Sequence, residues 1–228
     1  MNPLVLIPAR MAATRLPNKP LADIGGKPMI VRAYEAAAAS GLPTAVAAGG
    51  RAVLTDPDLP SGSDRIRAAL DAIDPGGAHD VVINLQGDMP FADPSISRLC
   101  ADLMAREPSC DIATLVAPEA SPEDRANPDV VKAVLALDGT GRSGRALYFT
   151  RSTLYGDGPV WRHIGVYGYR RAALEAFCAA PPSPLERREK LEQLRALEMG
   201  LSLWAAVIDE APLSVDNPAD LEAARKLA

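Results

Sequence analysis

The stretch that most constrains the fold is residues 4–21, LVLIPARMAATRLPNKPL. Its first four residues form an apolar run that is typical of a buried strand. The loop that follows contains three prolines, which restrict its backbone. It also carries three cations and no acid: Arg10, Arg15 and Lys19. A stiff cationic loop at the carboxyl end of a strand is suited to hold an anion such as a triphosphate. The alternative is that these are ordinary surface charges.

Length and composition are those of a globular protein. At 228 residues the chain can bury a full core, and we expect a single α/β domain over 1–228. Hydrophobic residues make up 48% and charged residues 23%, which excludes long disordered segments. No apolar run approaches the roughly 18 residues that a membrane span requires. The first residues lack the features of a signal peptide, so we expect a cytoplasmic protein without membrane insertion.

Charge and cysteine content narrow the class of ligand. A net charge of −5 argues against a nucleic-acid-binding surface, because phosphate backbones require a broad basic patch. Any bound polyanion should therefore be small and held locally. The 3 cysteines, without CxxC spacing, predict reduced interior residues rather than disulfides or a zinc site.

The hydrophobic periodicity predicts alternating strands and helices. We expect helices at 29–40, 63–73, 94–106 and 183–200, a terminal helix after 216, and strands at 4–7, 52–55, 81–85, 111–117 and 201–209. The order strand, loop, helix at the start is typical of a βαβ unit. Segments 127–137 and 145–151 flank a Gly-rich turn, which predicts antiparallel strands and a β elaboration at about 127–170.

A carboxylate follows the second strong strand. The apolar run 81–85 is followed by Gly87, whose missing side chain would allow close approach to a ligand, and then by Asp88. Ligands of parallel sheets gather at the carboxyl ends of the strands, so Asp88 and the cationic loop should share one crevice. Aspartate oxygens suit Mg²⁺, which also binds substrate phosphates. The alternative is that Asp88 only caps the turn before Pro90.

Three further polar features have both a structural and a functional interpretation. His163 lies on a strand with interleaved glycines and aromatics, where a histidine is more often structural. The charged residues of helix 183–200 are typical of a solvated face with i to i+3 and i+4 pairs. Asp216, before Asn-Pro, has the pattern of an N-cap or turn residue.

Taken together, the motifs resemble one family. In chain order they are PARMAATRLPNKPL, GGKPMIVRAYE, SGSDR, LQGDMP, NPDVVK, ALYFTR, HIGVYGYR, SPLERREKLEQLR and VDNPADLE. This series, which covers nearly the whole chain, is similar to that of the 3-deoxy-manno-octulosonate (Kdo) cytidylyltransferases, also called CMP-Kdo synthetases. The resemblance implies a Rossmann-like nucleotidyltransferase fold of the glycosyltransferase-A-like kind, with a mixed, mainly parallel sheet flanked by helices.

The activity implied by the resemblance is transfer of CMP from CTP to the anomeric hydroxyl of Kdo, with release of pyrophosphate, for lipopolysaccharide biosynthesis. The alternatives are a related acid-sugar acceptor, such as 8-amino-Kdo or a nonulosonate, and a catalytically weakened nucleotide-binding homologue. The resemblance also implies a homodimer formed through residues 145–170.

The resemblance also implies roles for individual residues. Arg10, Arg15 and Lys19 would hold the triphosphate, Asp88 and Asp216 would bind Mg²⁺, and Ala9 with Ser63 would contact the nucleotide. The sugar acid would contact another set of side chains: Gln86, His163, Tyr167, Glu192 and Gln193.

Two departures from the family pattern bear on the site. Met89 stands where the family usually has a glutamate, so one acid beside the metal site is missing. About a dozen residues of the family, roughly one short βα unit, are also missing after Thr44. We expect Ala52 to Thr55 to replace the lost strand beside the first one, which leaves a narrower sheet.

Overall fold

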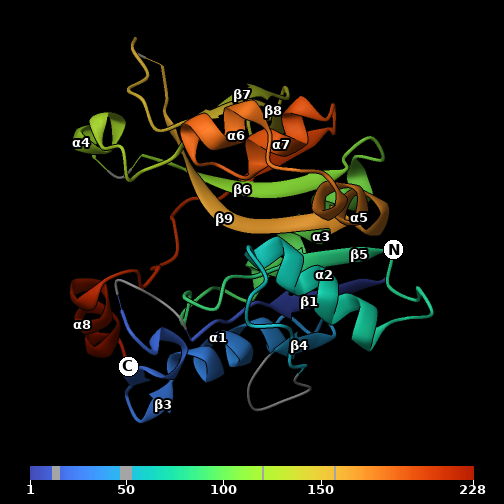
Figure 1. The fold of residues 1–228 in the computed structure, drawn as a ribbon. Coiled ribbons are helices and arrows are strands. Elements are labelled where there is room, and N and C mark those ends of the chain that lie inside the picture. The colour runs from blue at the N-terminus through green and yellow to red at the C-terminus, as the bar shows by residue number, and fades with distance from the viewer. Residues whose placement is uncertain (12–15, 47–52, 120, 157) are drawn as a thin grey trace. The chain divides into compact units, whose positions relative to one another are not determined.

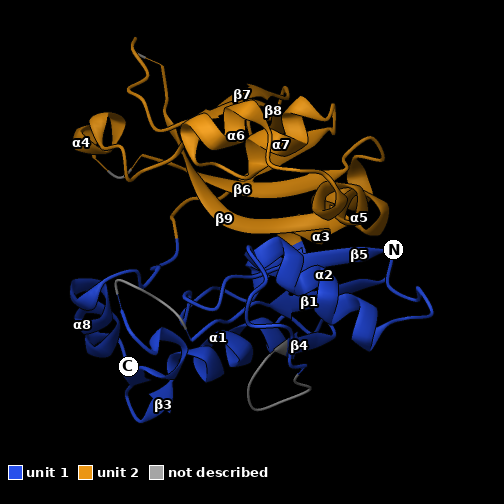
Figure 2. Ribbon diagram, in the orientation of Figure 1, with its two compact units in different colours: residues 1–98, 212–228 blue, residues 99–211 orange. Residues whose placement is uncertain are grey.

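The structure is a computed structural model that describes residues 1–11, 16–46, 53–119, 121–156 and 158–228 (Figure 1). It divides into two compact units, residues 1–98 with 212–228 and residues 99–211 (Figure 2). In the described part of the chain, no helix is long and apolar enough to cross a membrane. The organisation as one domain with a β elaboration stays a prediction.

The first unit is built on three parallel strands in the order β4-β1-β5. Strand β1 lies in the centre, and its residues Leu4 to Ile7 are all buried, as the apolar run predicts. The strands are β1 (Pro3–Ile7), β4 (Thr44–Val46) and β5 (Val81–Asn84). The other elements within this unit are η1 (Lys19–Leu21), β2 (Asp23–Ile24), β3 (Lys27–Pro28), α1 (Met29–Ala38), α2 (Gly62–Ile73) and α8 (Pro218–Lys226). Helix α3 (Ser95–Arg106) begins here and continues into the second unit.

The strand beside β1 is not the one that we predicted. Thr44–Val46 pairs in parallel with Val5 to Ile7, directly after the loop that ends α1. Val53 to Thr55 form no strand, and Ala52 lies outside the described residues. The prediction is wrong because the β-branched residues that follow Pro43 reach β1 first and occupy its free edge.

Helix boundaries in this unit follow from capping. Gly25 and Gly26 adopt positive φ values of 58° and 79° and form the tight turn between β2 and β3. Ser61, rather than Ser63, is the N-cap of α2, and its hydroxyl accepts from the Asp64 backbone amide at 3.1 Å. Both helix starts lie where the sequence places them.

The second unit contains five strands, and the last strand in their order also pairs with the first. Their order is β9-β6-β10-β8-β7, and β7 also pairs with β9. Only β6 and β10 run parallel, and the predicted antiparallel pairing of 127–137 with 145–151 is confirmed by β7 and β8. The strands are β6 (Ile112–Pro118), β7 (Lys132–Leu137), β8 (Ser143–Thr150), β9 (Trp161–Arg170) and β10 (Leu203–Val207). The helices are α4 (Pro122–Ala126), α5 (Arg171–Ala179), α6 (Pro184–Glu189) and α7 (Gln193–Glu198).

The predicted helix 183–200 is two helices. A capping box of Ser183 and Glu186 starts α6 at the predicted beginning of that helix. Lys190 then adopts the left-handed conformation with φ 56° and ends that helix, and α7 begins at Gln193. Periodicity continues across the break, so the sequence pattern does not reveal it.

The cysteines have the predicted interior character. Cys100 and Cys110 are buried, Cys178 is partly buried, and none of the three forms a disulfide bond. Burial raises the pKa of the Cys110 thiol to about 12. A thiol of this kind stays protonated and unreactive at neutral pH.

Candidate active site

The first unit brings together three residues that are far apart in the sequence. Lys19 donates through Nζ to Oδ2 of Asp88 at 2.8 Å and to Oδ1 of Asp216 at 3.1 Å. The Lys19 and Asp88 side chains are only 16% and 22% exposed, whereas Asp216 is 44% exposed. The cluster of Lys19, Asp88 and Asp216 therefore has one side within the protein and one side open to solvent.

The local structure explains why Lys19 points to these carboxylates. Asn18 adopts the left-handed conformation with φ 55°, and the 3₁₀ turn η1 begins at the next residue. Backbone amides of Lys19 and Ala22 bond to carbonyls of Leu16 and Lys19 at 3.1 Å each, which fixes the backbone on both sides of Lys19. Pro17 and Pro20, on either side of Asn18 and Lys19, restrict the backbone of this turn.

A small apolar core places Asp216 at the same spot. Ile24 of the β2–β3 hairpin packs with Met29 of α1, with Val215 and with Leu221 of α8. The Val215 amide donates to the Asp88 carbonyl at 2.9 Å, which joins the two acidic segments directly. Asp216 thus follows Val215, whose position is fixed by this core and by its bond to Asp88. It is not the N-cap of the terminal helix α8, which was the alternative interpretation of the sequence.

Helix α8 is capped by the next residue. The Asn217 side chain accepts from the Asp220 amide at 3.0 Å, while the Asp220 carboxylate accepts from the amides of Asp216 and Asn217. The Asp216 carboxylate accepts a bond from Lys19 instead of capping α8.

The donor set fits a hard divalent cation. Oδ1 of Asp88 is buried and has no hydrogen-bond partner among the described residues. A buried carboxylate oxygen without a partner is costly unless a ligand satisfies it. Those residues contain no group of three or more His, Cys, Asp or Glu around one point. Mg²⁺ commonly uses only one or two protein carboxylates, with substrate phosphates and water as the other ligands.

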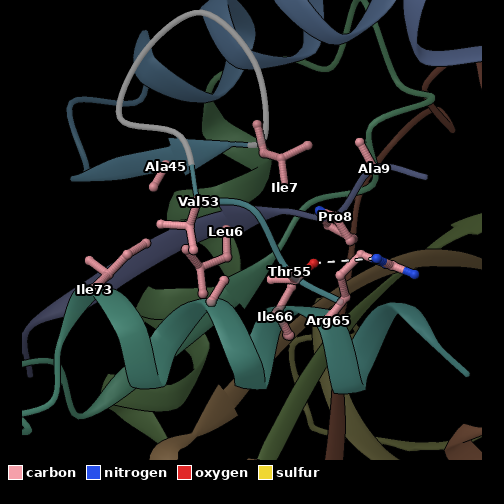
Figure 3. Close-up of a pocket in the computed structure, with 11 residues that line it drawn as sticks. Leu6, Ile7, Pro8, Ala9, Ala45, Val53, Thr55, Arg65, Ile66 and Ile73 are labelled. Atoms are coloured by element: carbon pink, nitrogen blue, oxygen red, sulfur yellow. Dashed lines mark hydrogen bonds between the residues drawn. The ribbon is translucent and has the colours of Figure 1, made fainter. Parts of the chain in front are cut away.

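The segment after β1 lies beside a pocket (Figure 3). Pro8 and Ala9 line one end of it with Thr55 and Arg65, and Ile73 of α2 lies at the other. The Arg65 guanidinium donates to the Thr55 hydroxyl at 3.3 Å and to carbonyls of residues 56, 57 and 59. Because this cation is 7% exposed, it holds segment 55–59 against the first turns of α2.

The other nucleotide residues that we predicted are placed as follows. Ser63 is buried in the first turn of α2, and Arg10 is exposed just after β1. Arg15 lies outside the described residues. Of the three predicted cations, Lys19 is the one whose contacts the structure defines.

Gly87 and Gln86 have neighbours that the sequence did not predict. A Cβ on Gly87 would lie 2.9 Å from Cδ1 of Ile30 and 3.1 Å from the Pro8 carbonyl. Packing within the protein therefore disfavours a side chain at Gly87, and close approach of a ligand there stays a prediction. The Gln86 amide donates to Oδ1 of buried Asn84 at 3.1 Å. Met89 is buried, with an exposed fraction of 5%.

The second unit contains a row of rings that includes two predicted sugar-binding residues. The His163 ring lies 5.0 Å from the Phe149 ring and 5.4 Å from the Tyr167 ring, measured between centroids. Burial lowers the pKa of His163 to about 3 and raises that of Tyr167 well above 10.0. Both side chains are therefore uncharged at neutral pH.

Thr114 on β6 organises this row. The register of β6 against β9 shifts between Thr114 and Leu115, so Gly165 and Val166 form a bulge. The Thr114 hydroxyl lies 2.8 Å from the Val166 carbonyl, 3.2 Å from the Ile164 carbonyl and 3.0 Å from Nε2 of His163. A hydroxyl has one proton, and the carbonyls can only accept it. Nε2 of His163 must then donate to Thr114, which leaves Nδ1 as the acceptor nitrogen of the neutral ring.

Helix α7 positions the remaining predicted residues. Glu192 precedes α7 and lies close enough to Tyr167 that its charge, added to burial, raises the tyrosine pKa. Gln193 is 6% exposed, and its side-chain Nε2 is buried without a hydrogen-bond partner among the described residues. An unsatisfied buried amide nitrogen is a donor that a ligand acceptor would satisfy.

A buried ion pair supports this helix from behind. Arg195 donates from Nε and Nη2 to the two carboxylate oxygens of Glu186, at 2.7 Å each. Its Nη1 also donates to carbonyls of Phe177 and Ala180, and its guanidinium lies 4.4 Å from the centroid of the Phe177 ring. The pair thus ties α5, α6 and α7 together around Gln193.

Sequence patterns did not single out Thr114, Arg65 or Arg195. Thr114 has the appearance of an ordinary β-branched residue in a buried strand. The charge pattern of helix 183–200 predicts a solvated face for Arg195, but the structure buries this residue. Glu186 and Arg195 lie nine positions apart, which would place them on opposite faces of a continuous helix, so the pair forms only because the helix is interrupted at Lys190.

Comparison with known proteins identifies the family of this chain. Residues 4–203 match the family described as cytidylyltransferase. A 3-deoxy-manno-octulosonate cytidylyltransferase of Parvibaculum lavamentivorans is 55% identical over 238 positions, which cover 98% of this chain and 92% of that protein. The protein of the same name from Paramagnetospirillum magneticum is 50% identical over 241 positions, covering 100% and 98%. Since the chain has 228 residues, the second alignment includes 13 positions that this chain lacks.

A solved structure extends the likeness to three dimensions. The CMP:2-keto-3-deoxy-manno-octonic acid synthetase, solved in complex with CTP, is 34% identical and superposes with a TM-score of 0.89 over 100% of this chain and 98% of that one. The predicted nucleotidyltransferase fold is thereby confirmed. On the sequence matches and this superposition, the chain belongs to the family of 3-deoxy-manno-octulosonate cytidylyltransferases.

Proposed function

We propose that this cytidylyltransferase moves CMP from CTP to the anomeric hydroxyl of Kdo and releases pyrophosphate, as a step toward lipopolysaccharide. The observation that carries the proposal is the cluster in which Lys19, from the loop after β1, bonds to Asp88 and Asp216. It provides a cation for phosphate oxygens and two carboxylates within one small volume. The family membership supplies the identity of both substrates.

The reaction requires positioning and charge neutralisation. An oxygen of the sugar acid forms a bond to the α-phosphorus while the α–β phosphoanhydride bond breaks, and the hydroxyl proton is lost to solvent or a nearby base. Charge accumulates on the phosphate oxygens, and donors already in place stabilise it most effectively. In this proposal Lys19, Arg10 and Arg15 serve as these donors.

The same cluster would hold Mg²⁺ through Asp88 and Asp216. Bound there with the triphosphate, the ion would neutralise phosphate charge and orient the attacking oxygen. Asp88 provides the buried oxygen without a partner, and Asp216 provides a solvent-facing carboxylate. The adjacent backbone of Ala9 and the first turn of α2 with Ser63 would contact the nucleoside.

The second unit would recognise the sugar acid. Nδ1 of His163 accepts from a hydroxyl, and the unsatisfied amide of Gln193 donates to an oxygen. Tyr167 adds a neutral hydroxyl, and Glu192 adds an acceptor. By the family resemblance, Gln86 would also contact the sugar acid. The uncharged groups of His163, Tyr167 and Gln193 suit a ligand rich in hydroxyls, because each polar contact must be matched.

We further propose a cytoplasmic homodimer. Leu147 on β8 is 52% exposed and Tyr155 is 94% exposed, both within the region 145–170. Exposed large apolar side chains in one segment favour a protein partner. Sedimentation as a monomer at micromolar concentration would contradict this part of the proposal.

Pyrophosphate release from CTP with a panel of sugar acids tests the activity. We expect turnover with Kdo that requires added Mg²⁺ and stops in EDTA. Turnover only with 8-amino-Kdo or a nonulosonate would change the acceptor and keep the reaction class. Nucleotide binding with no turnover on any acceptor would indicate the weakened homologue instead.

A further inference from the structure

The Lys19 ammonium occupies the space between two carboxylates where a divalent cation would bind. Its Nζ lies 2.8 Å from Asp88 and 3.1 Å from Asp216, so these oxygens cannot be farther apart than the sum of the two distances. A divalent cation bound to both oxygens would lie close to the ammonium, and the two positive charges would repel each other. The ammonium and Mg²⁺ therefore compete for this position.

The carboxylates do not depend on Lys19 for their positions. The Val215 amide bonds to the Asp88 carbonyl at 2.9 Å, and the Asp216 amide bonds to the Asp220 carboxylate at 2.8 Å. Both backbones would stay in place if the lysine side chain moved away. The space is thus built by the fold, and the lysine fills it.

Lys19 bonds only one of the two carboxylate oxygens of Asp88. It bonds Oδ2 of Asp88 and leaves the buried Oδ1 of the same carboxylate without a partner in the described part of the chain. A divalent cation with its water ligands could also bond this remaining Asp88 oxygen, which the ammonium does not reach. The lysine is therefore a replaceable occupant.

We infer that Lys19 excludes the metal until the nucleotide binds. The lysine side chain has a flexible four-carbon stem and a compact charge. A triphosphate offers the ammonium new acceptors and draws it away, and Asp88 with Asp216 then receive the divalent cation. Nucleotide and metal should consequently increase each other's affinity by the same factor. This inference rests on the proposed function, because it assumes that the triphosphate binds beside Lys19.

Binding of Mn²⁺ alone, followed by electron paramagnetic resonance of the free ion, tests this order. We expect Lys19→Met to bind Mn²⁺ without nucleotide about tenfold more tightly than the wild type, because a like charge at this distance shifts such equilibria by roughly that factor or more. Lys27→Met, which removes an exposed lysine paired with Glu35, is the matched control and should behave as the wild type. Adding Asp216→Asn to the Lys19 variant should remove the gain.

A saturating non-hydrolysable CTP analogue should raise the Mn²⁺ affinity of the wild type and reduce its difference from Lys19→Met. Thermal unfolding of each variant checks that it is folded. Dissociation constants for Lys19→Met and wild type within about threefold of each other would overturn the inference, since a displaced like charge is worth more. So would a gain that survives Asp216→Asn. If Mn²⁺ behaves as expected while CTP and Kdo yield no pyrophosphate, the proposed function fails and the exclusion by Lys19 stands.

Discussion

The buried pair of Glu186 and Arg195 leads to a quantitative prediction about stability. The two side chains are 10% and 8% exposed, and two bonds of 2.7 Å join them. Arg195→Met keeps the apolar stem but leaves the Glu186 carboxylate buried without its cation. It also leaves carbonyls of Phe177 and Ala180 without this donor. Removing one partner of a buried pair costs about 3–5 kcal/mol.

Urea unfolding at pH 7 measures this loss, and a second substitution identifies its source. Glu186→Leu combined with Arg195→Met removes both charges, so the double variant should lose clearly less stability than the sum of the single variants. Arg188→Met, which removes an exposed guanidinium paired with Glu189, should destabilise the protein far less than Arg195→Met does. A loss below about 1 kcal/mol for Arg195→Met would refute the reasoning, because the pair would then behave as a surface pair.

The pH dependence of the same pair has a defined sign. Burial alone would raise the pKa of Glu186, but hydrogen bonds from Arg195 and the Ser183 amide outweigh it and lower the pKa below 4.5. Because the folded-state pKa of Glu186 lies below the unfolded value, the ionised carboxylate stabilises the protein above pH 4.5. This stabilisation is lost as the pH falls through the folded-state pKa. The wild type should therefore lose stability on acidification below this pH more steeply than the double variant does.

Three further predictions concern the reaction and the ring row. Asp88→Asn and Asp216→Asn should each lower kcat with Mg²⁺ and CTP by about 10²–10³, as loss of preorganised charge does; near-normal pyrophosphate release in either variant would remove that residue from the metal site. His163 has its pKa lowered from 6.5 to about 3, so kcat/KM for Kdo should show no break near pH 6.5 from this ring. Its neutral burial should also make stability fall as the pH drops from 6.5 toward 3, by at most about 1.4 kcal/mol per unit, and His163→Asn should remove that slope in urea unfolding. Thr114→Val leaves two bulge carbonyls and Nε2 of His163 without the hydroxyl, which should cost about 1–3 kcal/mol and raise KM for Kdo with KM for CTP unchanged; an equal rise in both constants would contradict this role.

Local signals were sufficient where a structure depends on neighbouring residues. The capping box of Ser183, the helix start near Ser61 and the buried run Leu4 to Ile7 all occur as predicted. Each depends on interactions within a few positions, and such interactions can be read from the order of residues. The carboxylate Asp88 and the cation Lys19 were also identified, because both follow strands whose ends meet in one sheet.

Features that depend on contacts between distant segments could not be predicted from the order of residues. The edge of β1 is occupied by Thr44–Val46, since this segment reaches it with the shortest connection, and Val53 to Thr55 are left outside the sheet. The break at Lys190 separates two helices whose hydrophobic periodicity is continuous. Arg195 bonds both Glu186 of α6 and the Phe177 carbonyl of α5, and these contacts hold the two helices in place.

The sequence by itself determined the class of fold, the family and the individual residues from which a cytidylyltransferase site can be built. It did so because hydrophobic period, capping residues and motif order are properties of the chain alone. Only the tertiary structure decided that Lys19 lies between Asp88 and Asp216, and that Thr114 fixes the proton on His163. These arrangements depend on packing between segments up to 197 positions apart, and a hydrogen bond of 3 Å is set by that packing rather than by any local preference.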